Sequence, residues 1–205
     1  EYLPLRERID RTRKLYGEQQ NLLLMDNNVL ASNRLEDIIE DIKSCGFTKG
    51  AKYFEPNWYT IAIRNLRLGI NNRAYIRKSF KLLQELNTFK SFNENTRTEI
   101  YALREKHGLL HLETCTREAL IATYKDFAPY FDVKFKKRLG RLRFVDFNQG
   151  VDARLFNRRI VKLLAEIPVR PLRIAFDNIK TEPEYTKAIM MSEKYGMKDF
   201  SKGSN

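Results

Sequence analysis

Residues 145–155, VDFNQGVDARL, change character halfway along the stretch. The first half is extended and apolar, which is typical of a buried strand. The second half begins with an Asn-Gln-Gly sequence (148–150) and continues into Asp152 and Arg154. A short strand that ends at a glycine, with amides and a carboxylate beyond it, is what the ligand-binding end of an α/β unit requires. A turn followed by an N-capped helix would use the same residue types, because Asn and Asp favour both positions.

The order of strand, polar loop and helix also occurs upstream of this stretch. The apolar run at residues 22–25 predicts a buried strand, which ends at an Asp-Asn-Asn sequence (26–28). A capping box formed by Asn33 and Glu36 predicts the start of a helix, and Gly46 predicts its end. This segment therefore has the length and the order of one βα unit.

Two further units follow the same plan downstream. After a strand at 143–147, a helix is expected at about 155–166. A strand at 172–176 then ends at Asp177, and a Thr-x-x-Glu capping box at 181–184 predicts a last helix. Alternating βα units predict a parallel sheet with helices outside it, and right-handed crossovers place the post-strand loops at one edge. The residues expected to gather at this edge are Asp26, Asn27, Asn28, Asn148, Gln149, Asp152 and Asp177.

Between residues 51 and 142 the regular alternation weakens. Helices are expected at about 72–88, at 96–106, where Thr96 and Glu99 form a capping box, and at 116–127, with a strand at 109–112. These patterns predict a largely helical elaboration of the sheet. It contains most of the aromatic and basic surface candidates, which are Trp58, Tyr59, Arg64, Arg67, Arg73, Arg77, Lys78 and Lys81.

The composition limits the classes of function. The chain has 205 residues, 42% of them hydrophobic, which is enough for one sizeable core and a small second lobe. Its formal net charge of +12 favours anionic partners such as phosphates, nucleic acid or an acidic surface. No apolar run approaches the ~20 residues that span a bilayer, and the first residues lack the apolar core of a signal peptide. A cytoplasmic location, with no membrane partner, is therefore expected.

The metal-ligating residue types are sparse. Cys45 and Cys115 are the only cysteines and lie far apart, so the sequence indicates neither a disulfide framework nor a cluster of thiolates. His107 and His111 are four residues apart, a spacing that lets two histidines on one helix share an ion. Gly108 and the strand expected around His111 oppose that geometry, so we expect no metal site. The glycine-rich phosphate loops of dinucleotide-binding and NTP-binding proteins are absent.

The densest basic segment is Lys134–Arg143, KFKKRLGRLR, in which apolar residues are interleaved. Such a strip is a candidate for contacts with RNA or DNA phosphates. A solvated strand edge, on which lysines block pairing with another strand, would give the same pattern.

Three segments that end in polar residues together resemble the radical S-adenosylmethionine superfamily: NLLLMDNNVLAS (21–32), RFVDFNQGVDARL (143–155) and RPLRIAFD (170–177). The resemblance covers residues 1–46 and 143–200. It implies a partial (β/α)₆ barrel with a [4Fe–4S] cluster on a Cys-x-x-x-Cys-x-x-Cys loop after the first strand. In that superfamily the cluster cleaves S-adenosylmethionine reductively to a 5′-deoxyadenosyl radical.

The resemblance also implies cofactor-binding roles for the polar strand ends. The residues 26–28 stand at the end of the second strand, where the superfamily contacts the methionine amino group of the cofactor. Asn148, Gln149 and Asp152 follow the third strand. Asp177 falls where a carboxylate after the fourth strand faces the ribose or methionine moiety.

This chain departs from the superfamily because the three-cysteine loop is absent. The amphipathic helix expected at 5–16, which ends at Gly17, corresponds to the helix between the first and second strands. We therefore expect a fragment, truncated before the second strand and ending before a fifth. The expected function is a radical S-adenosylmethionine enzyme domain of unknown substrate, inactive in isolation because this chain alone does not bind the cluster. The alternative is a noncatalytic basic α/β module that binds RNA or another anionic partner.

The expected fold class is α/β, a fragment of a partial TIM-like barrel with parallel strands and a largely helical insertion. Its expected parts are the first visible βα units (1–50), the mainly helical insertion (51–142), the C-terminal βα units (143–200) and a loose tail (201–205).

Overall fold

The computed structural model describes residues 4–25, 29–136 and 139–197, and the chain divides into two compact units. Unit 1 comprises Glu1–Lys14, Glu18–Phe54 and Gly140–Asn205, and unit 2 comprises Leu15–Gly17 and Glu55–Leu139. Each unit has a hydrophobic core of its own.

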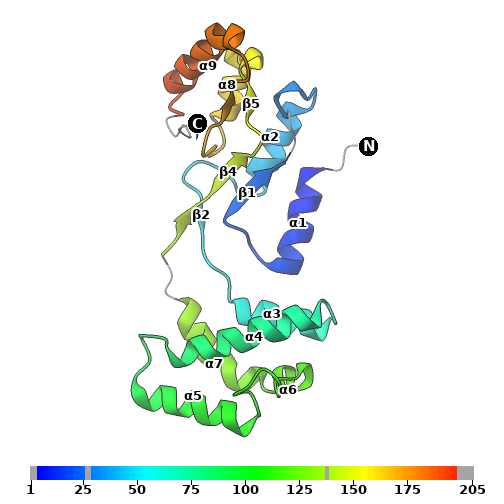
Figure 1. The fold of residues 1–205 in the computed structure, drawn as a ribbon, viewed down its shortest axis with the longest axis vertical. Helices are drawn as coiled ribbons and strands as arrows, with labels where there is room; N and C mark the ends of the chain where they lie inside the picture. The colour runs from blue at the N-terminus through cyan, green and yellow to red at the C-terminus, as the bar shows by residue number, and fades with distance from the viewer. Residues whose placement is uncertain (1–3, 26–28, 137–138, 198–205) are drawn as a thin grey trace. The chain divides into compact units, whose positions relative to one another are not determined.

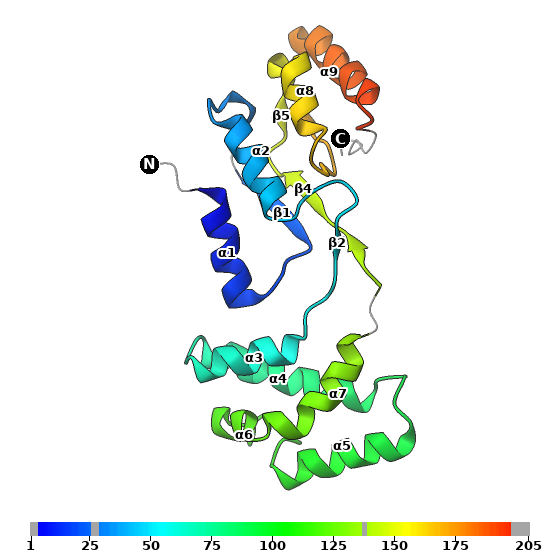
Figure 2. The ribbon, with the colours of Figure 1, turned by 180° about the vertical axis from the view of Figure 1, so that it is seen from behind.

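Unit 1 contains short parallel strands. Strand β1 (Asn21–Leu24) pairs in parallel with β4 (Phe144–Phe147), and both views of the ribbon show the two strands side by side (Figures 1 and 2). A parallel bridge connects Val145 to Val169, and β5 (Val151–Asp152) pairs in parallel with β6 (Ile174–Ala175). The predicted mixed α/β class with parallel strands is therefore confirmed. The described strands form three separate pairs and close no barrel.

Several helices of unit 1 contribute buried apolar residues to its core. In α2 (Leu35–Ser44) the buried positions are Leu35, Ile39 and Ile42, a helical spacing, and α2 contacts α8 (Arg158–Leu164). The other helical elements of this unit are α1 (Leu5–Tyr16), whose last two residues are counted in unit 2, η1 (Val29–Ala31), η2 (Ala153–Leu155), η3 (Ile179–Thr181) and α9 (Glu182–Lys194).

The chain leaves unit 1 after Phe54 and returns to it at Gly140. Next to these two points, β2 (Lys52–Tyr53) pairs with β3 (Arg141–Leu142) in antiparallel fashion. This pair lies within unit 1 and holds together the two ends of the helical segment.

Unit 2 is helical in its described residues. Its helices are α3 (Trp58–Arg67), α4 (Asn72–Asn87), α5 (Glu94–Lys106), α6 (Arg117–Ala122) and α7 (Tyr124–Lys136), all visible in Figure 1. Aromatic rings fill part of the core: the Tyr59 ring stacks on that of Phe131, with centroids 4.1 Å apart. The strand predicted at 109–112 is wrong, since this segment forms turns around the buried Leu109. The helix predicted at 116–127 is divided at Thr123 into α6 and α7.

The three predicted capping boxes are wrong in detail. The side chain that caps α5 is Asn93, whose Oδ1 accepts from the backbone N–H of Thr96 at 2.9 Å. Helix α2 begins after Arg34 without a side-chain cap. Thr181 precedes α9 but turns its hydroxyl away, donating to the carbonyl of Asn178 at 2.7 Å.

Candidate functional site

The predicted site residues divide into three groups. Asp26, Asn27 and Asn28 lie outside the described residues. Asn148 is half-buried directly after β4, and its backbone N–H donates to the carbonyl of Leu24 at 3.1 Å. Gln149 lies in the turn after β4, Asp152 is the last residue of β5 and Asp177 follows β6, and the three residues line one cavity of about 370 Å³.

This cavity, the strand-end cavity, lies at the carboxyl ends of parallel strands β5 and β6. Gly150 adopts a φ of +80°, a left-handed conformation that glycine adopts without strain, and the chain turns there from β4 into β5. The lining is mainly polar: Gln149, Gly150, Val151, Asp152, Ala153, Arg154, Ala175, Asp177, Asn178 and Thr181.

Asp152 and Arg154 form a tight pair within this lining. The Asp152 carboxylate accepts from the backbone N–H of Arg154 at 2.9 Å, from its Nε at 2.9 Å and from its Nη2 at 2.6 Å. Hydrogen bonding to Arg154 lowers the pKa of Asp152, and the same contact raises the pKa of Arg154. Asp152 therefore caps η2, which agrees with the alternative interpretation of this stretch as a turn and a capped helix. With Arg154 it also presents a charged pair to the cavity.

The loop after β6 supplies the other polar wall. Asn178 accepts from the backbone N–H of Lys180 at 2.9 Å through its side-chain oxygen. Asp177 is exposed and, among the described residues, makes no hydrogen bond or ion pair. Its carboxylate is close enough to Arg154 to raise the pKa of that guanidinium. Asp177, like the exposed Gln149, is thus accessible to solvent at this cavity.

The residues present do not fit a [4Fe–4S] cluster. Cys45 belongs to unit 1 and Cys115 to unit 2, and both side chains are buried. Burial raises the pKa of both thiols, that of Cys115 to about 11, whereas cluster ligands are thiolates. Within residues 4–25, 29–136 and 139–197, no group of three His, Cys, Asp or Glu side chains is arranged to hold a metal ion. His107 instead lies 3.4 Å from Asp126, and His111 is exposed.

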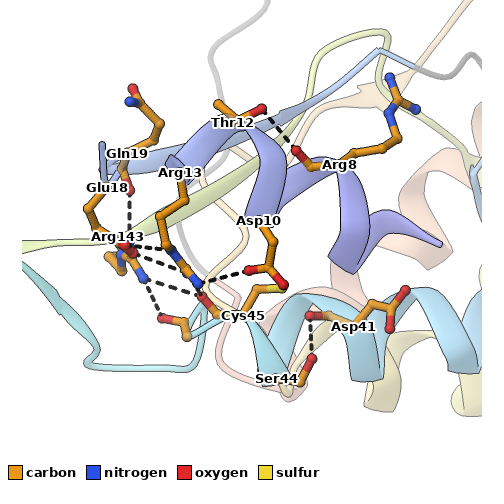
Figure 3. Close-up of polar contacts among 11 residues, drawn as sticks. Arg8, Asp10, Thr12, Arg13, Glu18, Gln19, Asp41, Ser44, Cys45 and Arg143 are labelled. Atoms are coloured by element: carbon orange, nitrogen blue, oxygen red, sulfur yellow. Dashed lines mark hydrogen bonds and ion pairs between the residues drawn. The ribbon is translucent and has the colours of Figure 1, made fainter. Parts of the chain in front are cut away.

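A second cavity, of about 700 Å³, was not anticipated from the sequence. Apolar residues of α1 and β1, such as Ile9 and Leu22, line one part of it, and Arg13, Glu18 and Arg143 line another. Figure 3 shows these three charged residues converging: Arg13 reaches Glu18 at 2.6 Å, and Arg143 also pairs with Glu18.

Arg143 is a structural residue. Its side chain is only 6% exposed and donates to the carbonyls of Gln19, at 2.8 Å, and Gly46, at 3.2 Å. It also lies over the Phe47 ring at 4.5 Å. Because Gly46 directly follows Cys45, the C-cap residue of α2, Arg143 binds the chain at the point where it leaves that helix.

The predicted basic strip Lys134–Arg143 therefore does not present all its charges to solvent. Lys134 is buried and pairs with Glu85 at 2.7 Å, and Arg143 is engaged as described. Arg141 is exposed and lies over the Tyr53 ring at 5.4 Å. Sequence reasoning missed these roles because Glu85 and Glu18 lie 49 and 125 positions away from their partners.

No helix in the described part of the chain is long and apolar enough to cross a membrane. Comparison of the sequence and the structure with known proteins found no matching family model, no matching curated protein and no matching solved structure.

Proposed function

We propose that unit 1 is part of a radical S-adenosylmethionine-type domain, and that the strand-end cavity is its contribution to cofactor binding. The observation that supports this is that Gln149, Asp152 and Asp177, which follow β4, end β5 and follow β6, line one cavity at the ends of parallel strands. In open α/β sheets, ligands bind at the carboxyl ends of the strands.

The chemistry of the lining suits an amino acid joined to a nucleoside. The Asp177 carboxylate is a free acceptor for an ammonium group or for ribose hydroxyls. Arg154 uses its Nε and Nη2 on Asp152, which leaves the N–H groups of Nη1 for a ligand carboxylate. Gln149 is exposed and offers both a donor and an acceptor.

The reductive cleavage that the superfamily performs requires a cluster that this chain does not ligate. We therefore assign the described residues a binding role, and no chemical step. Activity is tested on the gene product, reconstituted anaerobically with iron and sulfide. Formation of 5′-deoxyadenosine from S-adenosylmethionine is the expected result; a loaded cluster without this product would overturn the enzymatic part of the proposal.

The binding role is tested on the chain itself by isothermal titration calorimetry with S-adenosylmethionine. An Asp177→Asn substitution removes a charge without changing shape, and loss of one charged hydrogen bond costs about 1.5–3 kcal/mol, or roughly 10- to 150-fold in Kd. Glu193→Gln, an exposed charge on α9 outside the cavity, is the matched control and is expected to bind like the wild type. Absence of binding by the wild-type chain, or equal affinities for all three proteins, would refute the binding role.

A further inference from the structure

Positive charge in unit 2 is concentrated on one helical hairpin. The segment 58–87, which contains α3 and α4, has a single acidic residue, Glu85, and that carboxylate is engaged by Lys134 of α7. The basic residues of the same segment are Arg64, Arg67, Arg73, Arg77, Lys78 and Lys81. Six positive charges against one negative charge give the hairpin a net charge of +5.

Three of these residues form a stripe along α4, which we call the α4 stripe: Arg73, Arg77 and Lys81. They recur at every fourth position, so they lie about 6 Å apart along the helix axis. The buried residues of α4, such as Leu82 and Leu86, lie on the opposite side of the helix, about 180° around its axis from Arg77. The α4 stripe therefore faces away from the core of unit 2.

The α4 stripe is available to a partner. All three side chains are exposed, and none forms an ion pair with another described residue. Beside the stripe, the Lys78 ammonium lies 4.0 Å from the centre of the Trp58 ring, which places a half-buried aromatic surface next to the cations. None of the three cations therefore stabilises unit 2 through an ion pair between described residues.

We propose that the α4 stripe binds the phosphodiester backbone of a nucleic acid. A nucleic acid presents closely spaced charges along its length, about one per 1.7 Å of duplex, so each side chain of a linear stripe finds a phosphate. The planar guanidinium groups of Arg73 and Arg77 suit bidentate contacts with phosphate oxygens. This proposal concerns unit 2 and is independent of the function proposed for unit 1.

Two other anionic partners fit this surface less well. A membrane surface is bound by helices that insert an apolar face, whereas the apolar face of α4 is buried in the core of unit 2. An acidic protein surface is held by buried aromatic or aliphatic anchors, whereas the other exposed residues of α4 itself, Asn72, Ala74 and Gln84, provide none. Phosphate binding requires no such anchor.

The test is fluorescence anisotropy of the full chain with a labelled duplex of mixed sequence, made once as RNA and once as DNA. Three phosphate contacts predict a slope of about −2.7 for log K against log salt concentration, or a loss of about 40-fold between about 50 and about 200 mM NaCl. The variant R73A/R77A/K81A is expected to lose most of this slope. Alanine favours helix at exposed positions, so circular dichroism should show a folded variant.

The matched control is K180A/K187A/K194A, which removes three exposed charges from unit 1. If both triple variants weaken binding equally, net charge rather than the α4 stripe is responsible and the proposal fails. It also fails if neither duplex binds in low salt, or if polyglutamate or anionic lipid vesicles displace the duplex at equal charge concentration. Selective loss in the α4 variant supports it, and the RNA and DNA arms then identify the kind of nucleic acid.

Discussion

Replacement of Arg143 by methionine tests whether this buried cation holds unit 1 together. The guanidinium pairs with Glu18 and donates to the carbonyls of Gln19 and Gly46, so it connects the loop before β1 with the end of α2. Methionine keeps the length and most of the volume of the side chain but none of its donors. The substitution therefore removes the polar contacts and preserves packing on Phe47.

The expected cost follows from these contacts. Breaking a buried ion pair by removing one partner costs about 3–5 kcal/mol. In the variant Glu18, which is 32% exposed, still pairs with Arg13 at 2.6 Å and reaches solvent. Leaving the Glu18 carboxylate without Arg143 therefore costs less than this range. The two carbonyls lose a charged donor, at about 1.5–3 kcal/mol for a hydrogen bond of this kind. We expect a net loss of about 3 kcal/mol in the free energy of unfolding of unit 1, or roughly 150-fold in its unfolding constant.

Amide hydrogen exchange measures this loss within unit 1. Exchange of the β1 and β4 amides should accelerate by about 150-fold in Arg143→Met. Arg141→Met, which removes an exposed cation over Tyr53, is the control and should accelerate exchange by about fivefold or less. An acceleration below about tenfold in Arg143→Met, or equal effects of the two substitutions, would refute the reasoning. Trp58, the only tryptophan, lies in unit 2, and its fluorescence reports separately on that unit.

Two further predictions concern local contacts. Asn93→Ala should destabilise unit 2 by about 1 kcal/mol in urea unfolding followed by Trp58 fluorescence, because α5 loses its cap. Thr96→Ala should have little effect. A larger loss of stability in Thr96→Ala than in Asn93→Ala would instead support Thr96 as the cap, as in the capping box predicted from the sequence. Because the pKa of Asp152 is lowered in the fold, its pairing with Arg154 stabilises unit 1 above the unfolded-state pKa and is lost as pH falls through the folded pKa. In NMR titrations, Arg154→Gln should raise the pKa of Asp152, and an unchanged titration would contradict the pairing.

Elements with clear periodicity could be predicted from the sequence, and their exact starts could not. The helix expected at 5–16 is α1, and the helix expected at 72–88 is α4. The start of α5 was misplaced because Asn93 and Thr96 are both good caps, and only the backbone decides which side chain meets a free N–H. Helix α3 was missed since buried residues occur on most of its positions, which removes the one-sided pattern.

The candidate site was predictable to the extent that it depends on order along the chain. The order of strand, polar loop and helix predicts that Gln149, Asp152 and Asp177 lie near one another, and the structure has them lining one cavity, although Asp152 ends strand β5 instead of lying in the predicted loop. The pairing of Lys134 with Glu85 depends on how helices pack, which no local pattern encodes. We therefore expected the basic strip to be exposed along its length, although its first and last residues, Lys134 and Arg143, are buried.

The pairing of β2 with β3 has a consequence for how the chain folds. Asn21 and Phe144, partners in the parallel pair, are 123 positions apart, whereas Lys52 and Leu142 enclose 90 of those positions. Once the helical segment has folded and β2 has paired with β3, the loop that remains to be closed between β1 and β4 is about 33 residues long. Compared with closing the whole intervening segment, this lowers the entropic cost of pairing β1 with β4 by about 1 kcal/mol. The β1–β4 pair should thus form after the helical segment, and pulse-labelled amides of α4 should become protected before those of β1.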